Sequence, residues 1–311
     1  FGPPFIPGPP LSPPTIDITD QFGLNLKHGN LYGYSYIKPV DNLTLTIGAS
    51  YDDADSEYLD EEKGQFNPKF GIDWKLFSGT TLRASVFRTL KRTLITQQTL
   101  EPTQVAGFNQ FFDDLELTDT WQYGGAIDQK FTSSLFGGLE FTYRDLDVPY
   151  IQFSGATQST ERADWEESIG RAYLFWTPHE RLSLKAEYIY ENLKRDKDFS
   201  EGVEDSDTHS FPLGINFFHP SGISSSLTTT YYDQSGTFGG FYTTDPIQEG
   251  NDDFWLVDFS VSYRLPKRYG FITVGAANLF DEDFRYFDSD LNNASIQPGR
   301  IAFAKLTLAW P

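Results

Sequence analysis

The chain has 311 residues and a formal net charge of −20, with 44 acidic residues against 24 basic ones and no cysteine. The absence of cysteine excludes disulfides, thiolate metal sites and cysteine catalysis, and the acidic balance argues against a nucleic-acid-binding surface, which needs basic patches. Aromatic residues make up 16% of the chain, a content that acidic disordered chains lack, so this chain folds.

The first segment, residues 1–15, is rich in proline ("FGPPFIPGPPLSPPT"). Proline cannot donate a hydrogen bond inside a sheet, so we interpret residues 1–15 as a linker or domain boundary and expect the folded domain to begin at residue 16. The chain also contains no methionine, which indicates a processed product or a fragment of a longer protein.

Most of the remaining chain alternates between apolar and polar residues. In residues 43–51, "LTLTIGASY", every second residue is apolar, and the pattern recurs in residues 182–190 and 255–265. A period of two is typical of a β-strand with one apolar face. A fourteenth strand, with poorer alternation, is expected at Ile16–Lys27. The thirteen clear strands are predicted at residues 30–40, 43–54, 65–77, 81–92, 117–132, 134–146, 165–177, 182–193, 207–218, 223–235, 252–265, 270–283 and 299–310.

The predicted connections alternate strictly between short and long. Short turns are expected at residues 39–42, 78–80, 132–134, 177–181, 219–222 and 266–270. Long loops are expected at residues 54–65, 93–116, 147–164, 194–206, 236–251 and 284–298. Outer-membrane barrels have this organisation, with short periplasmic turns and long extracellular loops. A soluble β-sandwich has no reason to keep it over every connection.

Strand length and aromatic placement lead to the same fold. Many of the predicted strands reach the roughly 9–11 residues that a tilted strand needs to cross a bilayer. Aromatic residues also recur where strands approach the short turns, as in a girdle at a membrane interface: Tyr36, Trp74, Phe131, Trp176, Phe217, Tyr263 and Trp310. The sequence therefore predicts an all-β fold, a transmembrane antiparallel up-and-down β-barrel of about 14 strands formed by residues 16–311. The alternative is a soluble β-sheet protein with a large aromatic core.

Charged residues of both signs are expected on the lumen face of this barrel. A mixture of signs suits a wet interior or one crossed by salt bridges, and it selects no particular solute; these pairs could also simply hold the barrel in shape. The apolar residues of the long loop Thr93–Asp114 would otherwise be exposed, so this loop is the best candidate to fold into the lumen. The lumen-facing residues are Lys69, Asp73, Arg83, Glu140, Arg144, Lys185, Glu187, Asp258, Arg264 and Lys305.

Catalytic and metal-binding chemistry have weak support in the sequence. No glycine-rich phosphate loop or paired-histidine metal spacing occurs, so no cofactor is predicted. The four histidines are scattered, and His209 and Ser210 would point to opposite faces of a strand, so no enzymatic activity is expected. A solvated loop is the more ordinary interpretation of the acidic stretch after the second strand. The weak candidates there for a loosely held divalent ion are Asp52, Asp53, Asp55 and Glu57.

Many stretches, in chain order, resemble the C-terminal part of a TonB-dependent outer-membrane receptor barrel. "FWLVDFSVSYRLPKRYGFITVGAANLFDEDFRYF" is similar to the family's penultimate hairpin and its NLFD signature, and "GRIAFAKLTLAW" is similar to the closing strand. "DNLTLTIGASYD", "FNPKFGIDWKLFSGTTLRASVFRT", "LEPTQ" and "YLFWTPHERLSLKAEYIY" resemble earlier parts. Such receptors also carry a plug domain, an energy-coupling box and a barrel of about 22 strands. None of these is visible here, so the chain is either a fragment of a receptor or a compact barrel.

The resemblance implies transport of a solute across the bacterial cell outer membrane. One alternative is an export barrel fused behind a periplasmic repeat module, which the proline-rich start would fit. Another is a structural or adhesive surface barrel that acts through its loops. The implied partners are outer-membrane lipid and lipopolysaccharide, the barrel-assembly machinery, and a periplasmic energy-coupling or secretion partner acting through a missing upstream domain. No nucleic-acid partner is expected.

Overall fold

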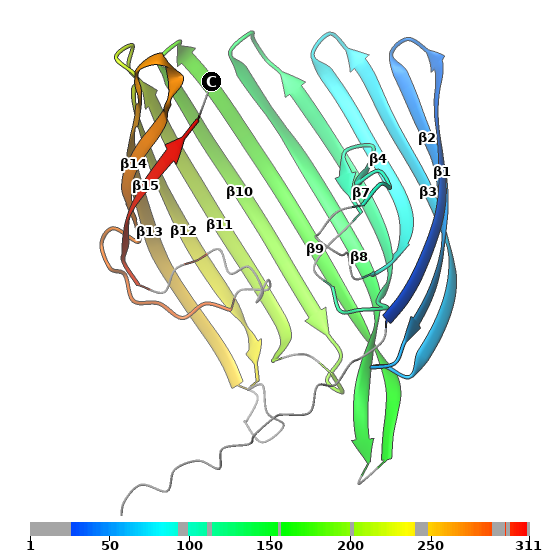
Figure 1. The fold of residues 1–311 in the computed structure, drawn as a ribbon. Coiled ribbons are helices and arrows are strands. Elements are labelled where there is room, and N and C mark those ends of the chain that lie inside the picture. Colours follow the sequence, from blue (N-terminus) through cyan, green and yellow to red (C-terminus); the bar gives the residue numbers. More distant parts are fainter. Residues whose placement is uncertain are drawn as a thin grey trace, which may run out of the picture.

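The computed structural model describes residues 26–92, 99–110, 114–154, 157–199, 202–239, 248–287, 296 and 299–309. They form one antiparallel sheet of 13 strands, in which each strand pairs with its neighbours in the sequence (Figure 1). A separate two-stranded hairpin lies between β4 and β7. The strands of the large sheet are β1 (Leu26–Val40), β2 (Leu43–Ser56), β3 (Glu61–Phe77), β4 (Thr80–Leu90), β7 (Asp119–Lys130), β8 (Leu135–Ser154), β9 (Thr157–His179), β10 (Leu182–Arg195), β11 (Val203–Phe218), β12 (Ile223–Phe238), β13 (Gln248–Arg264), β14 (Gly270–Ala277) and β15 (Ile301–Leu308).

All thirteen clearly predicted strands are present, but the strand expected at residues 270–283 ends at Ala277, and the chain turns at Asn278. The two faces of the sheet differ as the alternation requires. The sheet curves, and the hairpin β5 (Gln104–Val105) and β6 (Phe108–Asn109) lies over its concave face (Figure 1). The convex face exposes large apolar side chains from one edge of the sheet to the other, as a lipid-facing surface must. They include Leu31, Ile47, Phe70, Ile72, Ile127, Leu139, Phe141, Leu174, Leu213, Ile215, Leu227, Phe259, Val274 and Leu306.

Short turns join the strands at one end of the sheet, at the top of Figure 1. Asp41 and Asn42 join β1 to β2, and Ser78 and Gly79 join β3 to β4. Gly79 has φ +98°, a left-handed conformation that glycine adopts without strain. The β13–β14 turn contains the short helix η2 (Pro266–Arg268).

Two of the predicted long loops are wrong, because the strands continue through them. β2 and β3 pair up to Ser56 opposite Glu61, which leaves only residues 57–60 as a turn. β8 and β9 pair from Leu135 opposite Trp176 to Ser154 opposite Thr157. Residues 57–64 and 157–164 are mostly polar, and residues 147–154 carry apolar side chains on both faces, so the apolar alternation is lost in these stretches. Backbone pairing outside a bilayer does not require that alternation. The result is a hairpin arm that projects beyond the neighbouring strands (Figure 1).

One predicted aromatic position is also wrong. Tyr36 pairs directly with Thr46, a residue of the concave face, so Tyr36 does not join the convex aromatic girdle. Trp74, Trp176 and Tyr263 do lie exposed on the convex face, and the predicted position Trp310 lies outside the described residues.

The edges of the sheet are β1 and β15, and in the described part of the chain they do not pair with each other. With 13 antiparallel strands the two edge strands run in the same direction, so a fully antiparallel closure of the barrel requires an odd number of further strands. The fourteenth strand expected at Ile16–Lys27 and the linker at residues 1–15 lie outside the described residues, apart from Leu26 and Lys27, which belong to β1. Within the described residues, no helix is long and apolar enough to cross a membrane.

Candidate functional site

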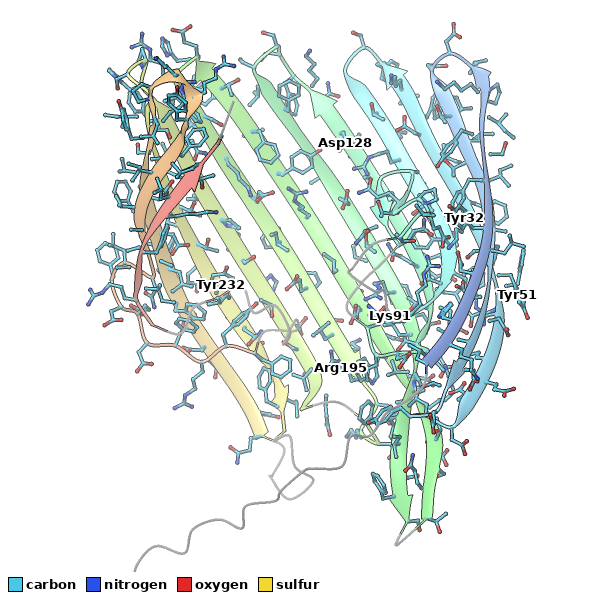
Figure 2. All side chains as sticks on the ribbon, in the orientation of Figure 1. Tyr32, Tyr51, Lys91, Asp128, Arg195 and Tyr232 are labelled. Carbon is cyan, nitrogen blue, oxygen red and sulfur yellow. The ribbon has the colours of Figure 1, made fainter. Side chains whose placement is uncertain are left out.

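The strand register places all ten predicted lumen residues on one face of the sheet, the concave one. Lys69 pairs with Phe87 and Asp73 pairs with Arg83, and the pairing continues strand by strand to Lys305, opposite Thr273. Side chains of this face fill the foreground of Figure 2. The concave face is therefore the candidate site, and its two halves differ in chemistry.

The first half, from β3 to β10, is crossed by ion pairs. The Arg83 guanidinium donates from Nε to Asp128 Oδ2 at 2.6 Å and from Nη2 to Glu140 Oε2 at 2.9 Å. The Tyr173 hydroxyl also donates to Asp128. These bonds join β4, β7, β8 and β9 across the face, so a solute that contacted Arg83 would compete with two carboxylates.

A second group of charges lies on β9 and β10. Arg171 Nε donates to Glu187 Oε1 at 2.9 Å, and Lys185 pairs with the other carboxylate oxygen. Nearer the long loops, the buried Arg144 binds Asp114 at 2.5 Å and Glu167 at 2.5 Å. Five of the predicted lumen residues thus have charged partners on their own face. At the short-turn end, a cavity of about 690 Å³ opens beside this network, lined in part by Lys75, Asp128 and Lys130.

Residues 99–110, which contain β5 and β6, cover part of this charged half. Val105 and Phe108 are buried against Phe87 of β4, and Phe108 also lies under the Arg83 guanidinium. A Cβ atom on Gly124 would lie 2.4 Å from the Phe108 ring, so glycine makes room for it. The expectation that the loop Thr93–Asp114 folds inward is confirmed for residues 99–110.

A buried carboxylate attaches this segment to the sheet. Glu101 accepts hydrogen bonds from Tyr34 at 2.7 Å and from Arg92 at 2.5 Å, and its other close cation is Lys69, at 3.5 Å. Lys69 is 1% exposed and Glu101 is 4% exposed. Gln110 adds a hydrogen bond to the Tyr34 hydroxyl at 3.1 Å. Glu101 and Tyr34 were absent from the predicted site, because neither a lone acid in a loop nor a strand tyrosine carries a sequence signal.

The four weak metal candidates do not come together. Asp52 is buried on the concave face, where it accepts bonds from His28, Asn30 and Asn67. Its neighbour Asp53 points to the opposite face, because successive residues of a strand alternate. Asp55 pairs with Lys27, and Glu57 lies in the turn. Among the described residues, no three acidic, histidine or cysteine side chains are close enough together to hold a metal ion.

The stretch after β14 turns back onto the second half of the concave face. Asn278 donates from Nδ2 to the Glu282 carbonyl at 2.9 Å and accepts the Glu282 N–H at 2.8 Å. Phe284 then stacks on Phe254 with ring centroids 4.2 Å apart, and the Phe287 N–H binds Gln234. The long loop predicted at residues 284–298 therefore starts, as far as Phe287, as a structured segment above β12 and β13.

At the long-loop end, the β8–β9 arm packs against the β2–β3 turn. Arg162 binds both Glu61 at 2.8 Å and Asp147 at 2.7 Å. Burial lowers the pKa of the nearby Lys63 ammonium, and the Arg162 charge lowers it further. On the concave side of the arm, the Phe199 ring stacks on the Tyr150 ring, with centroids 4.6 Å apart. These contacts fix the long-loop ends of non-adjacent strands relative to one another.

Comparisons with known proteins agree with this geometry. The family model described as "TonB dependent receptor-like, beta-barrel" matches residues 2–279. Among solved structures, the FrpB iron transporter from Neisseria meningitidis has a TM-score of 0.67 at 12% identity, over 90% of this chain and 45% of that one. The outer-membrane transporter YddB from Escherichia coli has a TM-score of 0.59 at 14% identity, over 91% and 44%.

A mutant of the ferric enterobactin receptor PfeA from Pseudomonas aeruginosa also matches, with a TM-score of 0.59 at 16% identity over 83% of this chain and 40% of that one. The chain thus spans less than half the length of these structures, which are transporters and receptors rather than enzymes. At such low identity the likeness shows the fold alone. A comparison with curated proteins gives no match.

Proposed function

The chain belongs to the family of TonB-dependent receptor-like β-barrels of the bacterial outer membrane, and from this premise we propose that it forms part of the wall of a transporter for a solute. The concave face would line the route and the convex face would meet lipid. The proposed role is transport and includes no catalysed reaction.

The observation that carries the proposal is the contrast between the two faces together with the inserted segment. The convex face exposes apolar side chains, whereas the concave face carries Arg83, Glu140 and Glu187 in ion pairs that need water or one another. Residues 99–110 then narrow the space on the concave side. A face that is polar and partly covered is what controlled passage of a solute requires.

Two other roles are supported less well. An export barrel would use the same wall but depends on an upstream periplasmic module. A structural or adhesive barrel would act through the arm of β8 and β9 and would not need a segment packed over the lumen face. Family membership favours uptake-type transport over both.

The partners follow from the two faces. We assign the convex apolar surface to outer-membrane lipid and, at the long-loop end, to lipopolysaccharide. The barrel-assembly machinery would insert the sheet, as it must for any strand-built span. An energy-coupling partner in the periplasm would act through parts of the protein outside the described residues.

The test is ion conductance of the purified protein in planar bilayers, before and after deletion of residues 97–110. We expect low conductance that rises sharply after the deletion, because Val105 and Phe108 leave the concave face. The control is Phe280→Ala. This phenylalanine is 72% exposed and lies outside residues 97–110, so its loss should leave the conductance low.

Two outcomes contradict the proposal. High conductance before the deletion indicates an open pore for passive diffusion. No conductance after the deletion means that other parts of the chain close the space, and a structural role is then favoured.

A further inference from the structure

The second half of the concave face, on β12, β13 and β14, is lined with hydroxyl groups instead of ion pairs. Its residues continue the rows of the strand register: Ser224 pairs with Ser262, which pairs with Thr273. All are partly exposed on the concave side. We call this surface the hydroxyl wall, and it consists of Ser224, Ser226, Thr228, Ser260, Ser262 and Thr273.

Two phenylalanines border the hydroxyl wall on the concave face. Phe303 pairs with Gly275 and Phe271 pairs with Arg264. Their exposed fractions are 43% and 49%, although both point away from the lipid-facing side. A Cβ atom on Gly275 would lie 2.8 Å from the Phe303 ring and 2.8 Å from Ser260 Cβ. The ring therefore lies across the glycine, next to the hydroxyl wall, with much of its surface open.

One row of paired residues across β12–β15 joins the hydroxyl wall to the Phe303 ring. Ser226 pairs with Ser260, Ser260 with Gly275, and Gly275 with Phe303. With strands about 4.8 Å apart, the row spans about 14 Å from the hydroxyl of Ser226 to the backbone of Phe303. Along this length a ligand would meet neutral hydrogen-bonding groups first and an apolar ring at the end.

Because serine and threonine hydroxyls both donate and accept hydrogen bonds, they match a partner that carries hydroxyls itself. The 2.7 Å contact between Ser262 Oγ and Thr273 Oγ1 shows that these groups already bind each other. An aromatic ring adds a flat apolar surface with a polarised edge. The combination fits a sugar, whose ring has an apolar face and a rim of hydroxyls.

Other ligand classes fit less well. An anionic solute would need a cluster of arginine or lysine. The hydroxyl wall itself contains neither, and the two cations on the flanking rows, Arg264 opposite Phe271 and Lys305 opposite Thr273, share this face with the acid Asp258. A bare metal ion would need several carboxylate, imidazole or thiolate ligands, and the described residues hold no such group. A fully apolar solute would remove water from the hydroxyl groups of the wall and offer them no hydrogen bonds in return.

Resting on the proposed transport function, we infer that the hydroxyl wall and Phe303 contact the solute, and that this solute is an uncharged, polyhydroxylated molecule such as an oligosaccharide. The ion-paired half of the concave face, which residues 99–110 cover, holds its own strands together and does not bind the solute. The route therefore follows β12–β15.

Cysteine protection tests this inference, because the natural chain has no cysteine. The variant Ser226→Cys, in isolated outer membranes, is treated with a water-soluble maleimide with and without maltohexaose, cellohexaose or xylohexaose. At least one sugar should slow the modification by the factor 1 + [sugar]/Kd, about fivefold at about four times Kd. Hexaglutamate and hexalysine should have no such effect. Lys197→Cys, in the connection after β10, is the control position and should be modified at the same rate throughout.

A second comparison isolates the ring. In the Ser226→Cys background, Phe303→Ala should abolish protection by the sugar, whereas Phe136→Ala, an exposed phenylalanine on the ion-paired half of the same face, should leave it intact. Heat-dependent migration on gels shows whether each variant is assembled.

The outcomes separate this inference from the proposed function. If the thiol introduced by Ser226→Cys is not modified at all, no aqueous route reaches the wall and the transport proposal itself fails. If it is modified but no sugar protects it, or the charged peptides protect it equally, transport stands and the sugar inference is overturned. Protection that survives Phe303→Ala also overturns it.

Discussion

The Lys69 ammonium and the Glu101 carboxylate lie 3.5 Å apart, both almost fully buried, and they join the middle of a membrane strand to a loop segment. Arg92 shares the same carboxylate at 2.5 Å. Removing one member of a buried ion pair typically costs about 3–5 kcal/mol, since its partner is left as an uncompensated charge. The position of residues 99–110 therefore depends strongly on Glu101.

The first prediction is that Glu101→Ala releases this segment from the concave face. Trypsin should then cleave faster after Lys91 and Arg92, which lead into the segment, and mass spectrometry of the fragments measures the rate. Glu249→Ala, at an exposed acid of β13, is the control and should not change the cleavage.

A double variant separates the ion pair from the loop's apolar contacts. Lys69→Leu combined with Glu101→Leu leaves Arg92 near Asp52 at 3.7 Å and removes two buried charges together. It should be cleaved more slowly than either single variant, because effects within one network do not add. Equal or faster cleavage of the double variant would show that the pair does not hold the segment.

The second prediction concerns the two faces of β13. Val257→Arg should weaken membrane assembly by roughly 2–4 kcal/mol near the bilayer midplane, because it places a charge in lipid. Ser260→Arg should assemble normally, since Ser260 lies on the concave face. Folding yield in urea and lipid vesicles measures both, and equal tolerance would contradict the face assignment.

The alternation of apolar and polar residues predicted the strands. The errors in face and length occurred where the alternating residues did not differ in polarity. In β1, residues 31–36 read "LYGYSY": tyrosine alternates with glycine and serine, so a girdle position and a concave position look alike. Only pairing with β2 assigns Tyr36 to the concave face. The β8–β9 arm was missed for a related reason, because outside the bilayer a strand does not need one apolar face.

The candidate site likewise contains residues that the sequence could place and contacts that it could not. Strand parity was enough to place Arg83, Glu140 and Lys305 on one face. The partners of Glu101 lie up to 67 residues away in the chain, and no spacing in the sequence indicates such contacts. The row from Ser226 to Phe303 likewise appears only once the register of four strands is known.

The third prediction assigns the long-loop end to the cell surface. A peptide tag inserted at Asp60, in the four-residue turn between β2 and β3, or at Gly202 should be reached by antibody on intact cells. A tag at Gly79 or Gly222, in the short turns, should be reached only after the outer membrane is permeabilised. Glu61 and Gly250 fall within long loops predicted from the sequence, but both residues belong to paired strands, so they are less suitable for an insertion. Surface labelling at Gly79 would invert the topology.

The last prediction concerns the turn at Asn278, which directs the chain back over β12 and β13. Asn278 has φ +46°, a conformation that asparagine tolerates better than most residues, and its side chain makes both hydrogen bonds to Glu282. Because the residue is buried, Asn278→Ala both strains the backbone and leaves the Glu282 groups unpaired.

Three substitutions separate these effects. Asn278→Gly keeps the backbone relaxed but loses both side-chain bonds, so it should cost less than Asn278→Ala. Asn278→Asp keeps the acceptor for the Glu282 N–H, but it buries a carboxylate against the Glu282 carbonyl and close to Asp258, whose Oδ1 accepts the residue 278 N–H at 2.9 Å. It should therefore cost more than Asn278→Gly. Each variant should loosen the stacking of Phe284 on Phe254, and Asn278→Gly should loosen it least. Hydrogen exchange at the Phe287 amide, which binds Gln234 at 2.8 Å, measures this loosening. Unchanged exchange in Asn278→Ala would show that the aromatic contacts hold the segment without the turn.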